Sequence, residues 1–237
     1  YNSIYYQEPE ERYPAGSASK GRAAELSLED CVVNALEQLQ PSIDVSSYNI
    51  STSEAGEVFF QILNNHPSLF FVKSSISYSY ISNQVLSYNV KYLGTEEEIQ
   101  FQRAAFRQEV QKALTWAASS SGTAERALAV HDYLVLECEY DYESYLNNNV
   151  PDISHTAYGA LVGKTAVCDG YAKAYACILA ELGIESKIVS SDSMNHAWNL
   201  VSVDGDWYHA DATWDDPTWD SIGRVSHRYF LLSDTAI

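Results

Sequence analysis

A two-residue turn signal in the C-terminal part of the chain constrains the fold more than any other feature. Asp204-Gly205 interrupts an apolar-rich stretch at residues 195–213, and an Asp-Gly pair in this setting predicts a tight β-hairpin. The turn sets the register of the two strands, which places His196 and Asp211 on one face as diagonal neighbours. Side chains at such positions can close to a hydrogen bond. The register pairs Val203 with Asp206, Ser202 with Trp207, Leu200 with His209, Trp198 with Asp211, and His196 with Thr213.

A predicted helix precedes the hairpin and begins at a cysteine. The Ala-rich run from Cys168 ends at Leu182, and Gly183 then favours the left-handed conformation that closes many helices. The start of a helix stabilises an anion, and therefore favours the thiolate form of Cys168. The helix-then-strand order, with a further strand at residues 186–190, predicts an α+β fold. The helical stripe that would face the sheet carries Cys168, Tyr171, Tyr175, Ile178 and Leu182.

Cys168, His196 and Asp211 together indicate nucleophilic catalysis. A carboxylate bonded to one imidazole nitrogen fixes the tautomer and leaves the other nitrogen for a thiol. A thiol activated by an adjacent imidazole is the nucleophile of cysteine enzymes. The spacing alone also fits a plainer interpretation, in which Cys168 is a small buried apolar residue and His196 is a hydrogen-bonded strand residue.

Three sequence blocks resemble the transglutaminase-like superfamily in order, spacing and residue type. They are GKTAVCDGYA at 163–172, NHAWN at 195–199 and WYHADATWDDP at 207–217. HRYFLL at 227–232 is similar to the segment that commonly follows in bacterial members. The resemblance implies a papain-like core, in which a nucleophile helix packs on an antiparallel sheet. It also implies that Cys168 is the nucleophile, His196 the base and Asp211 the orienting carboxylate.

The activity that the resemblance implies is acyl transfer on peptide or protein amides through a Cys168 thioester, without a cofactor. Water as the acceptor gives a cysteine protease or amidase, and an amine gives a protein cross-linker; the sequence leaves both open. The alternative is a non-catalytic protein- or peptide-binding module of a surface protein that retains the three residues. The 18 tyrosines and the acidic composition fit this alternative.

Other residues near the blocks are candidates for contact with a substrate or its oxyanion. The backbone N–H of Cys168 is the natural first oxyanion donor. Papain-like sites take a second donor from a side chain upstream of the cysteine, for which Tyr158 and His155 are the polar candidates. Trp198 and Trp214 either wall a substrate groove or pack the core beneath the hairpin. The candidates for substrate or oxyanion binding are Tyr158, Tyr171, Trp198 and Trp214.

No metal site is expected from the sequence. Asp215 and Asp216 could bind calcium, but they lie in no Asp/Asn/Gly calcium loop and equally fit a capped turn. The histidines show no zinc-ligand spacing. The other three cysteines are too few for a disulfide scaffold and are expected to be packing residues. The residues to which the sequence therefore assigns no metal site or disulfide are His131, Asp132, His209, His227, Cys31, Cys138 and Cys177.

The charge of the chain excludes some classes of function. Its formal net charge is −18, and half of its 32 acidic residues lie at 137–237. A nucleic-acid binder needs a basic surface, which this composition does not supply. No apolar run is long enough to span a bilayer. The acidity indicates either simple solubility or a groove that prefers neutral and basic peptides. The expected partner is a peptide or protein substrate. The sequence leaves the oligomeric state open.

The chain is expected to have three parts. Residues 1–24 read as a tail or linker, and 25–120 as a mixed helical and strand region that is either separate from the core or integral to it. Residues 121–237 form the transglutaminase-like core, either complete or truncated at the C-terminus. Because the chain starts at Tyr1 with a tail-like segment, we expect a secreted or cell-surface protein. Helices are predicted at 27–40, 57–65, 95–118 and 123–139, the last two capped by Thr95 and Thr123, with two strands within 70–92.

Overall fold

A computed structural model describes residues 26–216 and 224–236 of the chain, which divides into two compact units. One unit extends to residue 99 and the other begins at residue 100. The predicted boundary between 120 and 121 lies later in the sequence, after helix α3 (Glu96–Ala117). The predicted tail at 1–24 lies outside the described residues. Among the helices of the described ranges, none combines the length and the apolarity that a membrane crossing requires.

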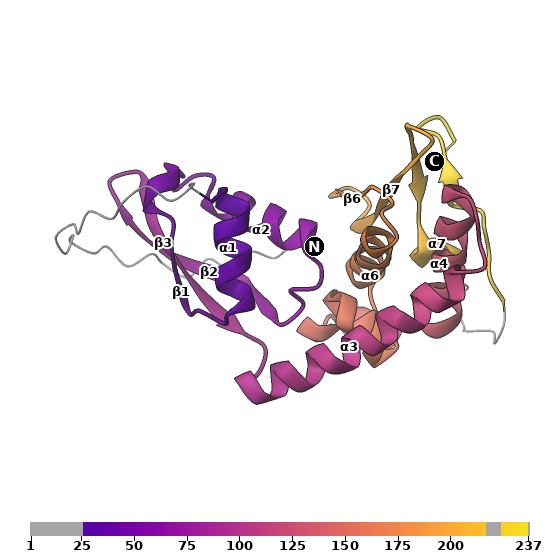
Figure 1. Ribbon diagram of the computed structural model, residues 1–237, viewed down its shortest axis with the longest axis horizontal. Helices are drawn as coiled ribbons and strands as arrows, with labels where there is room; N and C mark the ends of the chain where they lie inside the picture. Colours follow the sequence, from indigo (N-terminus) through magenta and orange to yellow (C-terminus); the bar gives the residue numbers. More distant parts are fainter. Residues whose placement is uncertain (1–25, 217–223, 237) are drawn as a thin grey trace. The chain divides into compact units, whose positions relative to one another are not determined.

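The first unit is a three-stranded antiparallel sheet with two helices packed beside it (Figure 1). Its strand order is β1-β3-β2, and Phe59 packs on the buried Tyr88 with ring centroids 5.2 Å apart. Ser27 caps the first helix, because its Oγ accepts a hydrogen bond from Asp30 N at 3.0 Å. The elements are α1 (Leu28–Glu37), β1 (Ser42–Asp44), η1 (Ser46–Tyr48), α2 (Ala55–Asn65), β2 (Val72–Ile81) and β3 (Gln84–Tyr92).

Two long helices follow. Thr95 starts α3 with a reciprocal capping box: its Oγ1 accepts from Glu98 N at 3.3 Å, and Glu98 Oε2 accepts from Thr95 N at 2.7 Å. The next helix is α4 (Thr123–Glu137), whose N-cap is Gly122. The prediction that Thr123 caps this helix is therefore wrong by one residue, because Thr123 is already helical.

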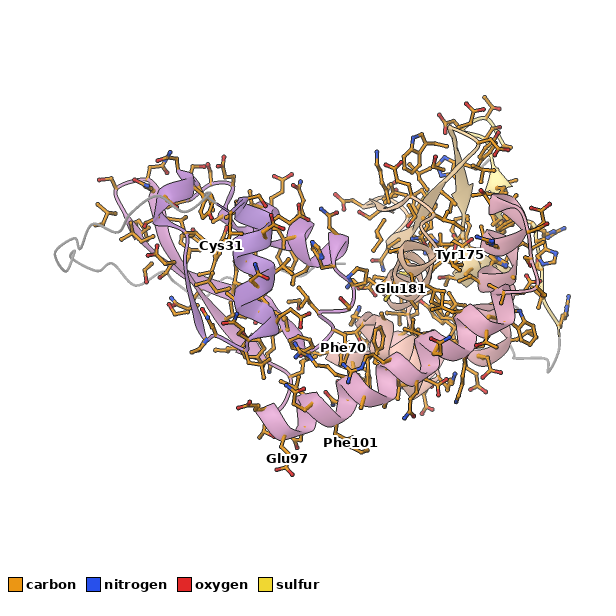
Figure 2. The ribbon with its side chains drawn as sticks, viewed as in Figure 1. Cys31, Phe70, Glu97, Phe101, Tyr175 and Glu181 are labelled. Carbon is orange, nitrogen blue, oxygen red and sulfur yellow. The ribbon has the colours of Figure 1, made fainter. Side chains whose placement is uncertain are left out.

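The second unit places α6 (Cys168–Glu181) and α4 against a four-stranded antiparallel sheet of order β6-β7-β8-β9. Tyr175 lies between the two helices (Figure 2), where its hydroxyl donates to Ala127 O at 2.9 Å. The α+β prediction is confirmed, with helices packed against antiparallel sheets. The remaining elements are β4 (Glu139–Tyr140), α5 (Tyr142–Leu146), η2 (Asp152–His155), η3 (Gly159–Gly163), β5 (Thr165–Ala166), β6 (Ser186–Ser191), β7 (His196–Val203), β8 (Asp206–Ala210), α7 (Ala212–Asp215) and β9 (Phe230–Leu232).

The hairpin between β7 and β8 has the predicted register near its turn. Three pairs are confirmed: Val203 with Asp206, Ser202 with Trp207, and Leu200 with His209. The pairs of Trp198 with Asp211 and of His196 with Thr213 are wrong, because β8 ends at Ala210. The chain leaves the sheet there and turns into α7.

The first turn of α6 lies unusually close to the preceding backbone. A Cβ atom on Gly170 would stand 2.5 Å from Ser154 O and 3.2 Å from Thr156 O, so only glycine fits at this position. The other end of the helix is closed by Gly183, with φ +69°, as predicted. The start of α6 is therefore held against η2, and this contact fixes where Cys168 points.

Candidate active site

Three secondary-structure boundaries bring the predicted nucleophile, base and carboxylate together. Cys168 is the first residue of α6, His196 the first residue of β7, and Asp211 the N-cap of α7. His196 Nε2 lies 2.5 Å from Asp211 Oδ2, and the ring also interacts electrostatically with the Cys168 side chain. With Nε2 taken by the carboxylate, Nδ1 is the nitrogen that remains for the sulfur. All three residues are buried, at 9%, 8% and 1% exposed for Cys168, His196 and Asp211.

Asp211 is held rigidly by the turn that replaces the end of the predicted strand. Its Oδ1 accepts from Thr213 N at 3.0 Å and from Trp214 N at 3.1 Å, which caps α7. Its own N–H donates to Tyr229 O at 2.9 Å. One carboxylate oxygen therefore serves the helix, and the other is left for His196.

The environment of His196 favours an imidazolium. Burial by itself would lower its pKa, but hydrogen bonds and charge interactions with Asp211 and Cys168 outweigh burial and raise the pKa to about 9. The ring therefore carries a proton at neutral pH. An imidazolium held by a carboxylate stabilises a neighbouring thiolate, which is the form in which a cysteine acts as a nucleophile.

Two tryptophans stack with the His196 ring. Trp214 stacks on it at 4.5 Å between ring centroids with 6° between planes, and Trp198 lies at 5.7 Å with 16°. Trp198 Nε1 donates to His209 Nδ1 at 2.8 Å. Trp214 is 41% exposed, so part of its surface is open to solvent beside the three residues. Both tryptophans position the imidazole; a contact with substrate stays a prediction.

The two tyrosines proposed from the sequence lie in different settings. Tyr171 is 1% exposed and its hydroxyl donates to Asp216 Oδ2 at 2.5 Å, so this side chain supports the segment after α7. Tyr158 is half-buried at the N-cap of η3. The oxyanion role considered for Tyr158 stays a prediction.

His155, the other oxyanion candidate, is engaged by a neighbouring acid. Its Nδ1 lies 2.9 Å from Asp169 Oδ1, and Lys173 Nζ donates to both His155 O and Asp169 Oδ2, at 2.8 and 3.3 Å. Burial would raise the pKa of Asp169, but Lys173 and His155 outweigh it and lower the pKa to about 2. This ionised cluster ties the start of α6 to the loop before it.

Tyr140 is a neighbour of the site that the sequence analysis missed. It lies on β4, which pairs in parallel with β5 so that Tyr140 stands beside Ala166, two residues before Cys168. Burial, followed by the charge at Cys168, raises the pKa of Tyr140 well above its usual value. The only sequence signal for it would have been the two-residue strand itself, which has no recognisable pattern.

The other cysteines are separate from the site. All four cysteines are free. Burial raises the pKa of the Cys138 and Cys177 thiols to about 12, which makes both unreactive near neutral pH. Cys31 is partly exposed in the first unit.

Comparison with known families agrees with this geometry. The profile of the Transglutaminase-like superfamily matches residues 108–212, a range that contains Cys168, His196 and Asp211. The chain contains a transglutaminase-like superfamily domain. The resemblance expected from the three sequence blocks is thereby confirmed, and the match extends upstream over all of α4 and the C-terminal part of α3.

Two solved structures resemble this chain at low identity. One, described as "Crystal structure of a TGase", has 15% identity and a TM-score of 0.43, covering 73% of this chain and 50% of its own. The other is described as a "Putative Cysteine Protease from Cytophaga hutchinsonii", with 16% identity and a TM-score of 0.37, covering 56% of this chain and 55% of its own. The chain thus spans about half the length of each. A comparison with curated proteins finds no match.

Proposed function

We propose that this domain is a cysteine-dependent acyltransferase or hydrolase that acts on amide bonds of peptides or proteins. The observation that supports this most directly is the buried His196 ring, which hydrogen bonds Asp211 and interacts electrostatically with Cys168. Membership of the transglutaminase-like superfamily adds to it, since members of that family are usually cysteine-dependent enzymes.

The proposed reaction proceeds in two steps. Cys168 Sγ attacks the carbonyl carbon, the C–N bond breaks, and His196 gives its proton to the departing amine, which leaves a thioester on the enzyme. Water or a second amine then loses a proton to His196 and attacks the thioester, which releases the Cys168 sulfur and restores the imidazolium. Asp211 keeps the ring oriented through both steps.

The oxyanion that forms in each step needs two donors. The Cys168 N–H is one, because the first N–H groups of a helix lack an intrahelical partner. We assign the second to the Tyr140 hydroxyl. This assignment is supported by the pairing of β4 with the segment that leads into Cys168, and by the electrostatic proximity of the phenol to the sulfur.

The second candidate function is a protein- or peptide-binding module that keeps the three residues without turnover. The burial of Cys168, at 9% exposed, favours this candidate, since a substrate carbonyl has to reach the sulfur. The electrostatic interaction between Cys168 and His196 favours the enzyme. The secreted or cell-surface location remains an expectation from the sequence alone.

The decisive experiment combines thiol labelling with two activity assays on the full chain. Iodoacetamide at pH 7, read by peptide mass mapping, should label Cys168 in the wild type and in Cys31→Ala, whereas Cys168→Ala should lose that label. Amine incorporation into a protein and hydrolysis of peptide amides are then measured side by side, and Cys168→Ala should abolish whichever occurs. Labelling of Cys168 without turnover in either assay would leave the binding module as the function.

Tyr140→Phe tests the proposed oxyanion donor. Loss of one donor lowers kcat by about 10²–10³-fold in a comparable site. Alkylation by iodoacetamide forms no oxyanion, so its rate at Cys168 should stay as in the wild type. An equal fall of both rates would show instead that Tyr140 acts on the nucleophile or on its position.

A further inference from the structure

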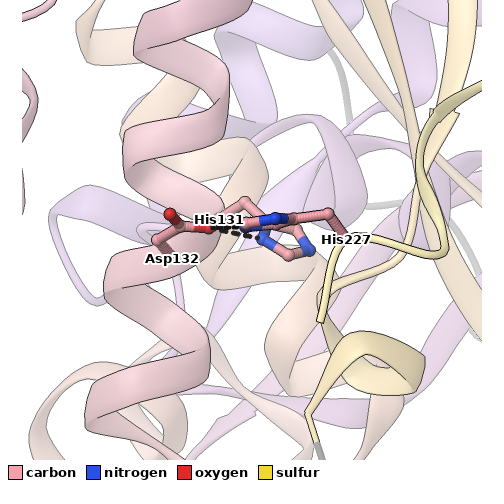
Figure 3. A group of neighbouring side chains, drawn as sticks. All are labelled: His131, Asp132 and His227. Atoms are coloured by element: carbon pink, nitrogen blue, oxygen red, sulfur yellow. Dashed lines mark hydrogen bonds and ion pairs between the residues drawn. The ribbon is translucent and has the colours of Figure 1, made fainter. Parts of the chain in front are cut away.

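A second cluster of metal-ligating side chains lies outside the candidate active site. His131 and Asp132 are consecutive residues of α4, and His227 comes from the segment that leads into β9 (Figure 3). One potential ligand atom from each of these residues lies within 4.8 Å of the other two. The fold thereby joins residues that show no metal-ligand spacing in the sequence.

His131 is prepared for a ligand role by its second nitrogen. The residue is 0% exposed, and its Nε2 lies 3.1 Å from Asp215 Oδ2, a carboxylate that is also 0% exposed. A carboxylate behind a histidine in this way fixes the tautomer that donates to it and directs the other nitrogen, here Nδ1, toward a metal. Asp215 is anchored in turn by the Tyr229 N–H, which donates to both of its oxygens, at 3.2 and 3.0 Å.

The spacing of the three atoms is close to that of a tetrahedral site. Zinc–nitrogen bonds of about 2.0–2.1 Å place neighbouring tetrahedral ligand atoms about 3.3 Å apart. The distance from His131 Nδ1 to Asp132 Oδ1 is 3.2 Å, and that from His227 Nε2 to Asp132 Oδ1 is 2.7 Å. Of these two distances, only the second has to widen. The His227 side chain can make that small shift, because it is 48% exposed on an irregular segment.

The donor set also selects the kind of ion. Two imidazoles and one carboxylate suit zinc and similar transition metals, whereas calcium and magnesium prefer sites made of oxygen. Three protein ligands leave a fourth position, which the exposed edge at His227 opens to water. The two carboxylates, Asp132 as ligand and Asp215 behind His131, balance the charge of a divalent ion.

We propose that His131 Nδ1, Asp132 Oδ1 and His227 Nε2 bind a divalent transition metal ion of the zinc type. The ion fastens the segment around His227 to α4. That segment also supplies Tyr229, whose carbonyl accepts from the Asp211 N–H, so the metal stabilises the turn that carries the candidate active-site carboxylate. The proposal does not depend on the proposed acyl-transfer activity.

Zinc binding to the full chain tests this proposal, with Cys168→Ala as the parent so that the Cys168 thiol cannot bind the ion. Isothermal titration with Zn²⁺ should give one site, and Co²⁺ should give the visible absorption of a tetrahedral site with nitrogen and oxygen ligands. His227→Ala is the test variant, because His227 is exposed and its loss leaves the buried pair intact. It should weaken Zn²⁺ binding by more than about 100-fold, since losing even an outer partner of a metal ligand costs about 10–100-fold.

His66→Ala in the same parent is the matched control, since His66 is also partly exposed and lies 2.9 Å from a carboxylate oxygen of Glu29. This variant should bind Zn²⁺ as tightly as the parent. Zn²⁺ should also raise the Tm of the parent and of His66→Ala but not that of His227→Ala. Absence of a site in the parent, or equal affinity of the parent and His227→Ala, would overturn the proposal.

Discussion

The two ends of α7 hold two buried histidine–aspartate pairs. Asp211, the N-cap, bonds His196, and Asp215, the last residue of the helix, bonds His131. Both carboxylates are at most 1% exposed. In both pairs burial lowers the pKa of the imidazole, and carboxylate partners outweigh it and raise that pKa. The same local chemistry therefore occurs twice, one helical turn apart.

The two pairs differ in the group that lies next to the second nitrogen of the imidazole. The His196 ring interacts with the Cys168 side chain and stacks with Trp198 and Trp214. The His131 ring meets a second carboxylate, Asp132, and is fully enclosed. A buried His–Asp pair is thus not a catalytic site by itself. The third group decides whether the imidazole can activate a nucleophile or can only bind a proton or a metal.

Asp211→Asn should produce the largest loss of activity. Asparagine keeps the size of the side chain but removes the charge that holds the His196 proton and fixes the ring, and the corresponding change in a serine protease lowers kcat by about 10⁴-fold. The matched comparison is Asp215→Asn at the other end of α7, which leaves Cys168 and His196 in place. Turnover of a peptide amide, normalised to folded protein, should fall far more for Asp211→Asn. Equal losses of turnover would show that the two pairs do not differ in function.

Asp215→Ala should produce the largest loss of stability. Removing one partner of a buried ion pair leaves the other charge uncompensated and costs about 3–5 kcal/mol. The control is Asp234→Ala, which breaks the contact of His209 with a carboxylate that is 91% exposed and should cost about 0–1 kcal/mol. Urea unfolding measures both. A free energy of unfolding that Asp215→Ala leaves unchanged would show that His131 does not need its buried partner.

Local signals made one pair predictable from the sequence. The Asp204-Gly205 turn sets the hairpin register as far as Leu200 and His209, and Gly183 marks the end of α6. Together with the three family blocks, these signals were enough to place Cys168, His196 and Asp211 side by side. The end of β8 was mispredicted, because periodicity cannot distinguish a continuing strand from a residue such as Asp211 whose side chain caps the next helix.

The other pair was beyond sequence reasoning for a physical reason. His131 and Asp215 are 84 positions apart, and His227 meets Asp132 across 95 positions, so only the packing of α4 against α7 and the segment before β9 brings them together. No motif or spacing encodes such contacts. The parallel pairing that sets Tyr140 beside the Cys168 segment involves two strands of two residues each, which is too short for any pattern to show.

The pH dependence of acyl transfer should follow His196. Because its folded pKa is raised to about 9 from an ordinary 6.5, the imidazolium and its stabilising pairing are fully present below 6.5 and are lost as the pH rises through about 9. The profile of kcat/KM should therefore fall above about pH 9, whereas alkylation of Cys168 needs no acid and should not fall there. Asp211→Asn should move the falling limb to lower pH.

Asp215→Ala provides the contrast for this profile, since the His131 pair does not contact the thiol. In Asp215→Ala, the fall of kcat/KM should stay near pH 9 wherever the protein remains folded. A shift as large as that of Asp211→Asn would mean that the two pairs titrate together through α7.

Trp214→Leu should have a smaller effect than Asp211→Asn or Asp215→Ala. The indole face that stacks on the His196 ring at 4.5 Å stabilises an imidazolium by about 0.5–1 kcal/mol at a partly exposed position. Since one pKa unit corresponds to about 1.36 kcal/mol, its loss should move the falling limb of kcat/KM down by about half a pH unit. Trp207→Leu is the control, because Trp207 contacts a cation elsewhere, Lys187 Nζ at 4.3 Å from its ring centroid, and should leave the limb in place. If the falling limb of kcat/KM moved to higher pH in Trp214→Leu, the indole would desolvate His196 more than it stabilises the charge. Asp211 and Cys168 alone would then hold the proton.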